Sequence, residues 1–219
     1  FFFGLLAVYF FSLRNMNYRN LPALWKNLIT FLNIFSISCV LCSLSSRFIF
    51  PQMSLEGQAF WVIGMAPTTM GRILLSKFMA SCLSMLVISA VLMFISTQML
   101  EVAPDTQAVA LLLAACLSSG IAGLSTGNGA IFMDLKERNP SAIVSSFGGT
   151  LNLVMTLLFM LACIFPVALF FHYKQLGYLD DTILRFARPI LVLLLIFLTA
   201  IATVVPLLAA RTSLCRRDY

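Results

Sequence analysis

Hydrophobic residues occur in long runs along this chain, and short segments between the runs carry almost all of the charge. One run, residues 141–171, has 31 uncharged residues, more than a single perpendicular crossing of a bilayer needs. Pro166 near its end predicts that the helix kinks there, or breaks so that its last stretch lies re-entrant or along the interface. Four further runs are each long enough to cross about 30 Å of hydrocarbon as an α-helix: residues 27–46, 78–100, 106–133 and 189–210.

The pattern therefore predicts an all-α fold, a polytopic membrane helix bundle with five complete transmembrane helices. Residues 1–13 form one more apolar run, which is too short to span a bilayer. It begins with Phe and lacks the charged start and cleavage pattern of a signal peptide, so we expect a truncated transmembrane helix. We treat residues 1–219 as a single transmembrane domain that is a fragment of a longer protein.

Residues 47–77 differ from the runs on either side because they combine prolines, a carboxylate, amides and cations. Hydrocarbon accepts such groups only at a high cost, so we expect this segment to lie at a membrane surface. Its apolar side chains recur at helical spacing and predict an amphipathic helix packed on the transmembrane helices: Leu55, Ala59, Val62, Ile63 and Ala66. Glu56, Gln58 and Trp61 then face the aqueous side or a partner, as in a helix that couples outside movement to the membrane.

Composition agrees with a membrane protein. The chain has 61% hydrophobic and 10% charged residues and a mean hydropathy of +1.00, more apolar surface than a soluble domain of this size could bury. The net charge of +6 comes from cations at the ends of apolar runs, so we expect lipid contact and no nucleic-acid partner. A cytoplasmic C-terminus would put eight cations inside and six outside, a small bias that places residues 47–77 in the cytoplasm.

Cysteine and histidine offer little for catalysis. Five of the six cysteines lie inside apolar runs, so we expect no disulfide framework. Cys39 and Cys42 form a C-x-x-C on one helix face, but their apolar surroundings favour packing over a redox or metal role. His172 is the only histidine, and we expect it at the interface. We predict no catalytic, cofactor-binding or metal site.

Small and amide side chains within the runs predict contacts between helices. Gly123 and Gly127 have the small-xxx-small spacing that lets a neighbouring helix approach closely, although such glycines could also let a helix bend during transport. No lysine follows this glycine-rich stretch, so it is no phosphate-binding loop and we expect no ATP site in these residues. Asn33 is expected to form an interhelical hydrogen bond. Residues 134–140 predict a solvated turn, with contact to a partner protein as the alternative.

Two segments carry a resemblance to a known family. Residues 47–67 read RFIFPQMSLEGQAFWVIGMAP and are followed by Lys77, and residues 134–154 read DLKERNPSAIVSSFGGTLNLV. The first resembles a cytoplasmic segment of bacterial ATP-binding-cassette (ABC) exporter permeases of the type 2 class, with the phrase R-x-x-x-P-x-x-S-L-E-G-x-x-F-W-x-x-x-x-x-P. The second is similar to a turn of the same permeases that ends in N-P and leads into S-x-F-G-G.

This resemblance implies a permease subunit in the bacterial inner membrane that moves an unidentified substrate outward. It implies a separate ABC ATPase subunit, so this chain itself would be no enzyme, and an N-terminal part of the permease in addition to these residues. The positions that match the family phrase are Glu56, Gly57, Phe60, Trp61, Pro67 and Lys77. The candidate contacts with the ATPase are Glu56, Gln58, Phe60, Trp61, Pro67 and Lys77. Residues 47–77 would then be the coupling segment.

Two other classes stay open. A membrane-embedded enzyme acting on lipid or peptide would place His, Asp or Glu within or beside its spans, and the apolar runs contain no acid. An accessory membrane subunit without energy coupling would need only the helices. The lack of charge in the runs favours an apolar or amphipathic cargo in the case of a transporter.

Overall fold

A computed structural model describes residues 23–59, 69–99, 104–135, 137, 139–175 and 181–215. Helices make up all of the regular structure in these ranges. Three short elements continue directly from the first helix: the π-helix η2 (Ser45–Ile49) and the 3-10 helices η3 (Phe50–Gln52) and η4 (Ser54–Ala59). The α-helices are α2 (Ala23–Leu44), α4 (Met70–Met99), α5 (Pro104–Ile131), α6 (Pro140–Ser145), α7 (Phe147–Gln175) and α8 (Asp181–Cys215).

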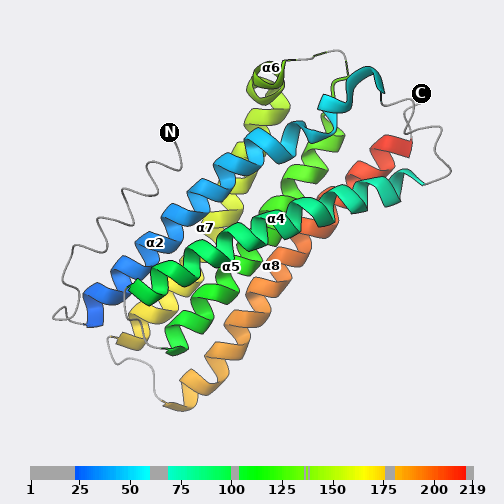
Figure 1. The fold of residues 1–219 in the computed structure, drawn as a ribbon. Coiled ribbons are helices and arrows are strands. Elements are labelled where there is room, and N and C mark those ends of the chain that lie inside the picture. The colour runs from blue at the N-terminus through cyan, green and yellow to red at the C-terminus, as the bar shows by residue number, and fades with distance from the viewer. Residues whose placement is uncertain are drawn as a thin grey trace.

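The five long helices form an elongated bundle around α5, which contacts α2, α4, α7 and α8 (Figure 1). The most apolar window of α5 is 61% buried, against 22% for those of α4 and α8. Each long helix is long and apolar enough to cross a membrane, which confirms the five predicted spans. The spans are Phe31–Gln52, Met70–Gln98, Gln107–Ile131, Phe147–Tyr173 and Phe186–Leu214.

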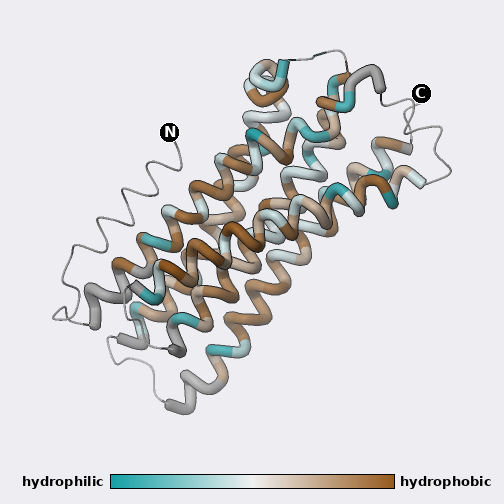
Figure 2. Tube along the Cα trace, viewed as in Figure 1, coloured by the Kyte–Doolittle hydropathy of each residue, from teal (hydrophilic) through white to brown (hydrophobic). Residues whose placement is uncertain are grey.

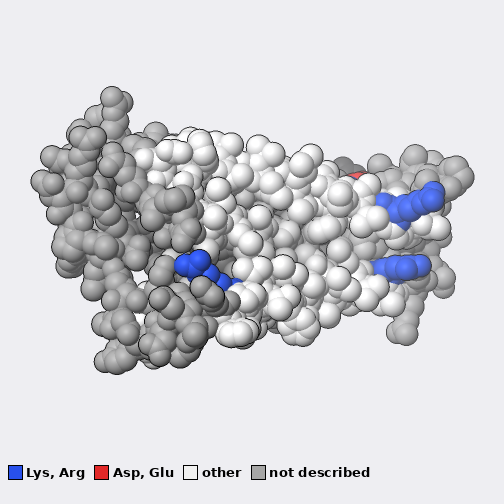
Figure 3. Space-filling model, turned by 90° about the horizontal axis from the view of Figure 1, so that it is seen from below, with Lys and Arg blue, Asp and Glu red and all other residues white. Residues whose placement is uncertain are grey.

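The surface of the bundle has the polarity that a bilayer requires. Large side chains such as Phe165, Leu193 and Phe197 are 63–66% exposed, which would be costly in water but is favourable in lipid. Hydrophobic residues fill the middle of the helices (Figure 2). Seen from below, the described Lys and Arg side chains lie toward the two ends, with an uncharged surface between them (Figure 3). The described part is thus a multi-pass helical membrane bundle.

The predicted break in residues 141–171 needs correction. Residues 141–171 do break, but at Ser146, where the backbone is extended with ψ 168°, while α7 continues through Pro166 without interruption. Asn139 caps α6 by accepting a hydrogen bond from the Ser141 backbone N–H at 3.1 Å, and Ser146 Oγ accepts from the Gly149 N–H at 3.4 Å at the start of α7. Ser146 therefore marks the boundary between α6 and α7, while Asn139 marks the start of α6. The predicted truncated helix, residues 1–13, lies outside the described residues.

The two ends of the predicted surface segment, residues 47–77, lie in long helical stretches. Residues 47–52 continue the first candidate span, and Arg72 and Lys77 lie within the first turns of α4. A small second core joins Met53, which lies between η3 and η4, to the ends of α4, α5 and α8: Leu74, Ala130, Met133, Ala210 and Leu214.

Candidate functional site

The ends of several elements meet at one end of the bundle, which we call the polar end: η2–η4, the first turns of α4, α6 and α7, and the last turns of α5 and α8 (Figure 1). Phe50 and Met53 are 1% and 2% exposed there. A Cβ atom on Gly129 of α5 would lie 2.3 Å from the Phe50 carbonyl oxygen, so only glycine admits the backbone at this point. The stretch formed by η2, η3 and η4, which we call the η segment, is thus packed into the bundle.

This packing changes the predicted orientation of the amphipathic segment. Leu55, which the sequence places on the packed face, is 48% exposed, while Glu56, predicted to face outward, is only 23% exposed at its side chain. The 3-10 geometry of η4 turns each residue further than the α-helical spacing assumes, so the faces differ. Gln58 lies in η4, whereas Phe60, Trp61 and Pro67 lie outside the described residues.

Two polar contacts fasten the η segment to α4. Glu56 forms an ion pair with Lys77, and the two side chains are 23% and 17% exposed. One turn further along α4, Ser81 Oγ donates a hydrogen bond of 3.1 Å to Gln52 Oε1. The structure therefore brings together Glu56 and Lys77, two of the predicted site residues that lie 21 positions apart in the sequence.

The carboxylate of Glu56 is only partly satisfied. Oε1 is held by Lys77, while Oε2 is buried and has no hydrogen-bond partner in the structure described. A buried acceptor without a partner costs roughly 1–3 kcal/mol, and more when it is charged. Lys77 compensates much of this charge, so the pair is the main electrostatic tie between η4 and the membrane helix.

A further contact reaches α5. Ser54 Oγ accepts a hydrogen bond of 3.1 Å from the backbone N–H of Asp134, which lies just beyond the end of α5. The Ser54 hydroxyl thus binds the start of the segment 134–140. In that segment the Asn139 N–H donates to Glu137 Oε1 at 3.0 Å. The η segment is thus tied to both α4 and the end of α5.

A buried amide network lies beneath these contacts. Asn128 Nδ2 of α5 donates to Asn152 Oδ1 of α7 at 3.2 Å. Asn152 Nδ2 lies 3.2 Å from Ser125 Oγ and 3.4 Å from Ser46 Oγ of η2. All four side chains are at most 7% exposed. Because hydrocarbon offers no other partners, the network joins α5, α7 and η2 at fixed positions.

Glycines set the contact between α5 and α8. A Cβ atom on Gly123 would lie 2.7 Å from Thr203 Cα, and one on Gly127 would lie 2.4 Å from Pro206 Cβ. Real Cβ atoms do not approach so closely, so a side chain at either glycine would push α8 away. Asn33 donates a hydrogen bond to Ser96 across α2 and α4, which confirms its predicted interhelical role. Cys39, Cys42, Cys82, Cys116 and Cys163 are free.

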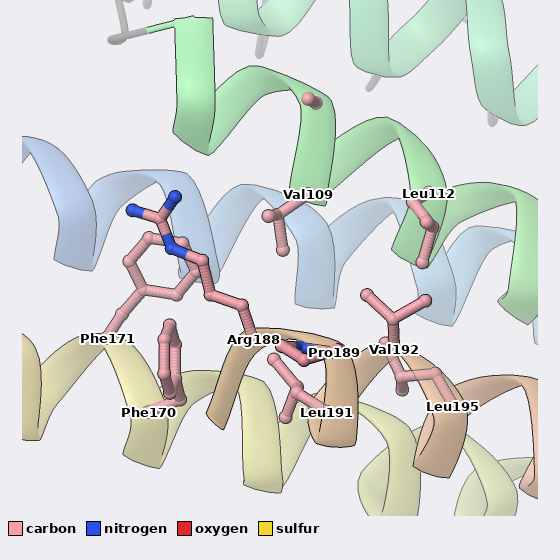
Figure 4. A pocket seen from close by; sticks show the side chains of 10 residues that line it. Val109, Leu112, Phe170, Phe171, Arg188, Pro189, Leu191, Val192 and Leu195 are labelled. Atoms are coloured by element: carbon pink, nitrogen blue, oxygen red, sulfur yellow. The ribbon is translucent and has the colours of Figure 1, made fainter. Parts of the chain in front are cut away.

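A pocket at the opposite end of the bundle, which we call the far-end pocket, lies between α5, α7 and α8 (Figure 4). Its volume is about 330 Å³, and apolar side chains such as Leu112, Phe170 and Leu195 line most of it. Arg188 is the one charged residue in the lining, and its side chain extends from α8 toward Phe171 in the view of Figure 4. The shape and polarity suit an amphipathic molecule.

Sequence reasoning missed the amide network. Asn128 and Asn152 are polar side chains within apolar runs, and that signal was available in the sequence. Sequence reasoning also did not pair Arg72 with Arg211, which line one groove between α4 and α8. Among the described residues no group of three or more His, Cys, Asp or Glu could hold a metal ion.

These features define a helical multi-pass membrane protein with a polar end built from packed helix termini. The chain belongs to the family described as "Putative ATP-binding cassette", whose family model matches residues 1–218. Neither the comparison with curated proteins nor the comparison with solved structures gave a match. Family and fold together associate the chain with ABC transport machinery in a membrane.

Proposed function

We propose that this chain is the membrane-spanning permease part of an ABC exporter that works with a separate ATPase subunit. The family match over residues 1–218 supports an ABC assignment, and the described residues form membrane helices. These 219 residues contain no G-x-x-x-x-G-K-[ST] loop, so ATP would be hydrolysed by the partner. A bacterial inner membrane location and an outward direction follow from the resemblance of residues 47–67 to exporter permeases.

The ion pair between Glu56 and Lys77 is the observation that carries this proposal. It connects η4, which lies in the proposed coupling segment (residues 47–77), directly to α4. Force applied to η4 by an ATPase would reach α4 through this pair and α5 through Ser54 and Asp134. Closely packed helices transmit such displacements because their cores deform little. The amide network would pass the movement from α5 to α7.

The far-end pocket supports an amphipathic cargo. Its lining is apolar apart from Arg188 at its edge, so a hydrocarbon part would lie against Leu112 and Leu195. The residues that line the pocket lie in the first turns of α5 and α8 and the last turns of α7. These turns are at the end of the bundle opposite η4 (Figure 1). In this proposal, movement at the polar end changes the access to the pocket.

The test uses the affinity-tagged full-length protein purified from its native membranes. The expected result is a co-purified subunit that hydrolyses ATP and is inhibited by vanadate. Glu56→Lys and Lys77→Glu should each reduce the co-purified ATPase activity about tenfold, because like charges would separate η4 from α4. The double variant with both changes should restore it. His172→Glu, an exposed change at the opposite end, is the matched control and should leave the activity unchanged.

Two results would contradict the proposal. One is a purified protein with no ATP-hydrolysing subunit, which would favour an accessory subunit. The other is labelling of a cysteine introduced at Leu55 from the extracytoplasmic side, because an ATPase in the cytoplasm could not reach the segment. The variant Glu56→Ala with Trp61→Ala tests the same surface, and we expect it to insert normally in the membrane but not to transport.

A further inference from the structure

A groove separates the first turns of α4 from the last turns of α8 at the polar end. Its volume is about 310 Å³, and it has two arginines at its outer part, Arg72 and Arg211, with leucines below them. No Asp or Glu contributes to its described lining. The two helices run in opposite directions, so their charged termini lie at the same edge of the membrane-spanning region (Figure 1).

Positive charge gathers here, and no carboxylate of the described lining offsets it. Both arginines are exposed, and neither side chain forms an ion pair or hydrogen bond with the described part of the chain. The side chain of Arg211 crosses the first turn of α4, where its Nε lies 3.4 Å from the position of a Cβ atom on Gly71. The first turn of α4 is positive and the last turn of α8 is negative, so the two helix ends offset each other and the two arginines supply the positive charge of the groove. An anion would relieve the repulsion between the two arginines.

The lower part of the groove is apolar and open to lipid. Leu75 and Leu208 are 54% and 55% exposed, and Leu74 at the base is buried. The described surface beyond them, toward the middle of the bundle, carries no charge (Figure 3). A ligand that fits both parts combines an anionic head with a hydrocarbon chain.

We propose that this groove binds an anionic phospholipid, with its phosphate between Arg72 and Arg211 and an acyl chain along Leu75 and Leu208. Arginine matches phosphate oxygens in geometry and charge, and basic pockets between membrane helices suit lipid headgroups. A free anion would gain nothing from the leucines. A zwitterionic lipid would bring its own cation close to the arginines and lose most of the attraction. This site is independent of the proposed transport function.

The experiment is native mass spectrometry of the full-length protein in detergent, titrated with phosphatidylglycerol or with phosphatidylcholine of the same acyl chains. We expect phosphatidylglycerol to bind more tightly, and less so at high salt. Arg72→Gln and Arg211→Gln should each weaken its binding roughly fivefold. Arg47→Gln removes an exposed cation of the polar end outside the groove, so it is the matched control and should change little.

Leu208→Trp narrows the groove but keeps both cations, and it should also weaken phosphatidylglycerol binding. The double change of both arginines to lysine should retain the preference for the anionic lipid, which excludes loss of folding as the cause. Equal binding of the two lipids, or unchanged binding in the glutamine variants, would overturn the proposal. Displacement of phosphatidylglycerol by an equal concentration of inorganic phosphate would also overturn it, because the leucines would then contribute nothing.

Discussion

The substitution Gly127→Ala tests the close contact between α5 and α8. An added Cβ atom would lie 2.4 Å from Pro206 Cβ and 2.7 Å from the Pro206 carbonyl carbon. Carbon atoms in ordinary contact lie about 3.5–4.0 Å apart, so α8 would have to move outward by roughly 1 Å. Pro206 offers no side-chain rotation that could relieve the overlap, because its ring is fixed to the backbone.

Two opposing terms set the expected magnitude. Alanine is favoured over glycine within a helix by up to about 1 kcal/mol, while overpacking a tight contact costs about 1–3 kcal/mol. At Gly127 the overlap involves backbone atoms, so the packing cost exceeds the propensity gain and we expect a net loss of about 1–2 kcal/mol. For a chain of 219 residues this corresponds to a fall in unfolding temperature of roughly 2–8 °C.

Gly71→Ala is the matched control. There the nearest atom to an added Cβ is Arg211 Nε at 3.4 Å, and this flexible side chain can move away. We expect no loss of stability, or a small gain. The measurement is the unfolding temperature of the purified protein in one detergent, followed by size-exclusion elution after heating. An unfolding temperature of Gly127→Ala equal to or above that of the unmodified protein would refute the packing argument.

Two further predictions concern the interior. Asn152→Leu removes the three side-chain hydrogen bonds at the centre of the amide network. An interhelical hydrogen bond contributes on average about 0.6 kcal/mol, so we expect the free energy of unfolding to fall by roughly 2 kcal/mol in the same heating assay. An unchanged unfolding temperature would show that the network is not stabilising. In a Cys215→Ser background a membrane-impermeant maleimide should leave sealed vesicles unlabelled, because the other five cysteines lie within spans. Rapid labelling there would mean that water reaches the interior of the bundle.

The sequence by itself determined the membrane class and the five spans. The length of an apolar run is a local property, and any run of sufficient length must form a helix in lipid to satisfy its backbone. It also singled out Asn33, because a lone amide in such a run needs a partner on another helix. The sequence predicted the ends of the helices less well. The boundary at Ser146 depends on a hydrogen bond of its hydroxyl, which hydropathy does not reveal. Hydropathy also does not show that α7 continues through Pro166.

Only the tertiary structure decided which polar side chains meet. The Glu56–Lys77 ion pair joins η4 to α4, and the groove lined by Arg72 and Arg211 lies between α4 and α8. The residues of each pair are not neighbours in the sequence, so only the folded chain brings them together. Their meeting depends on how each helix is rotated about its axis and how far it slides along its neighbours. Those two quantities are set by packing, such as the seating of α8 on Gly127, and hydrophobic periodicity on a helix that is apolar on every face does not specify them.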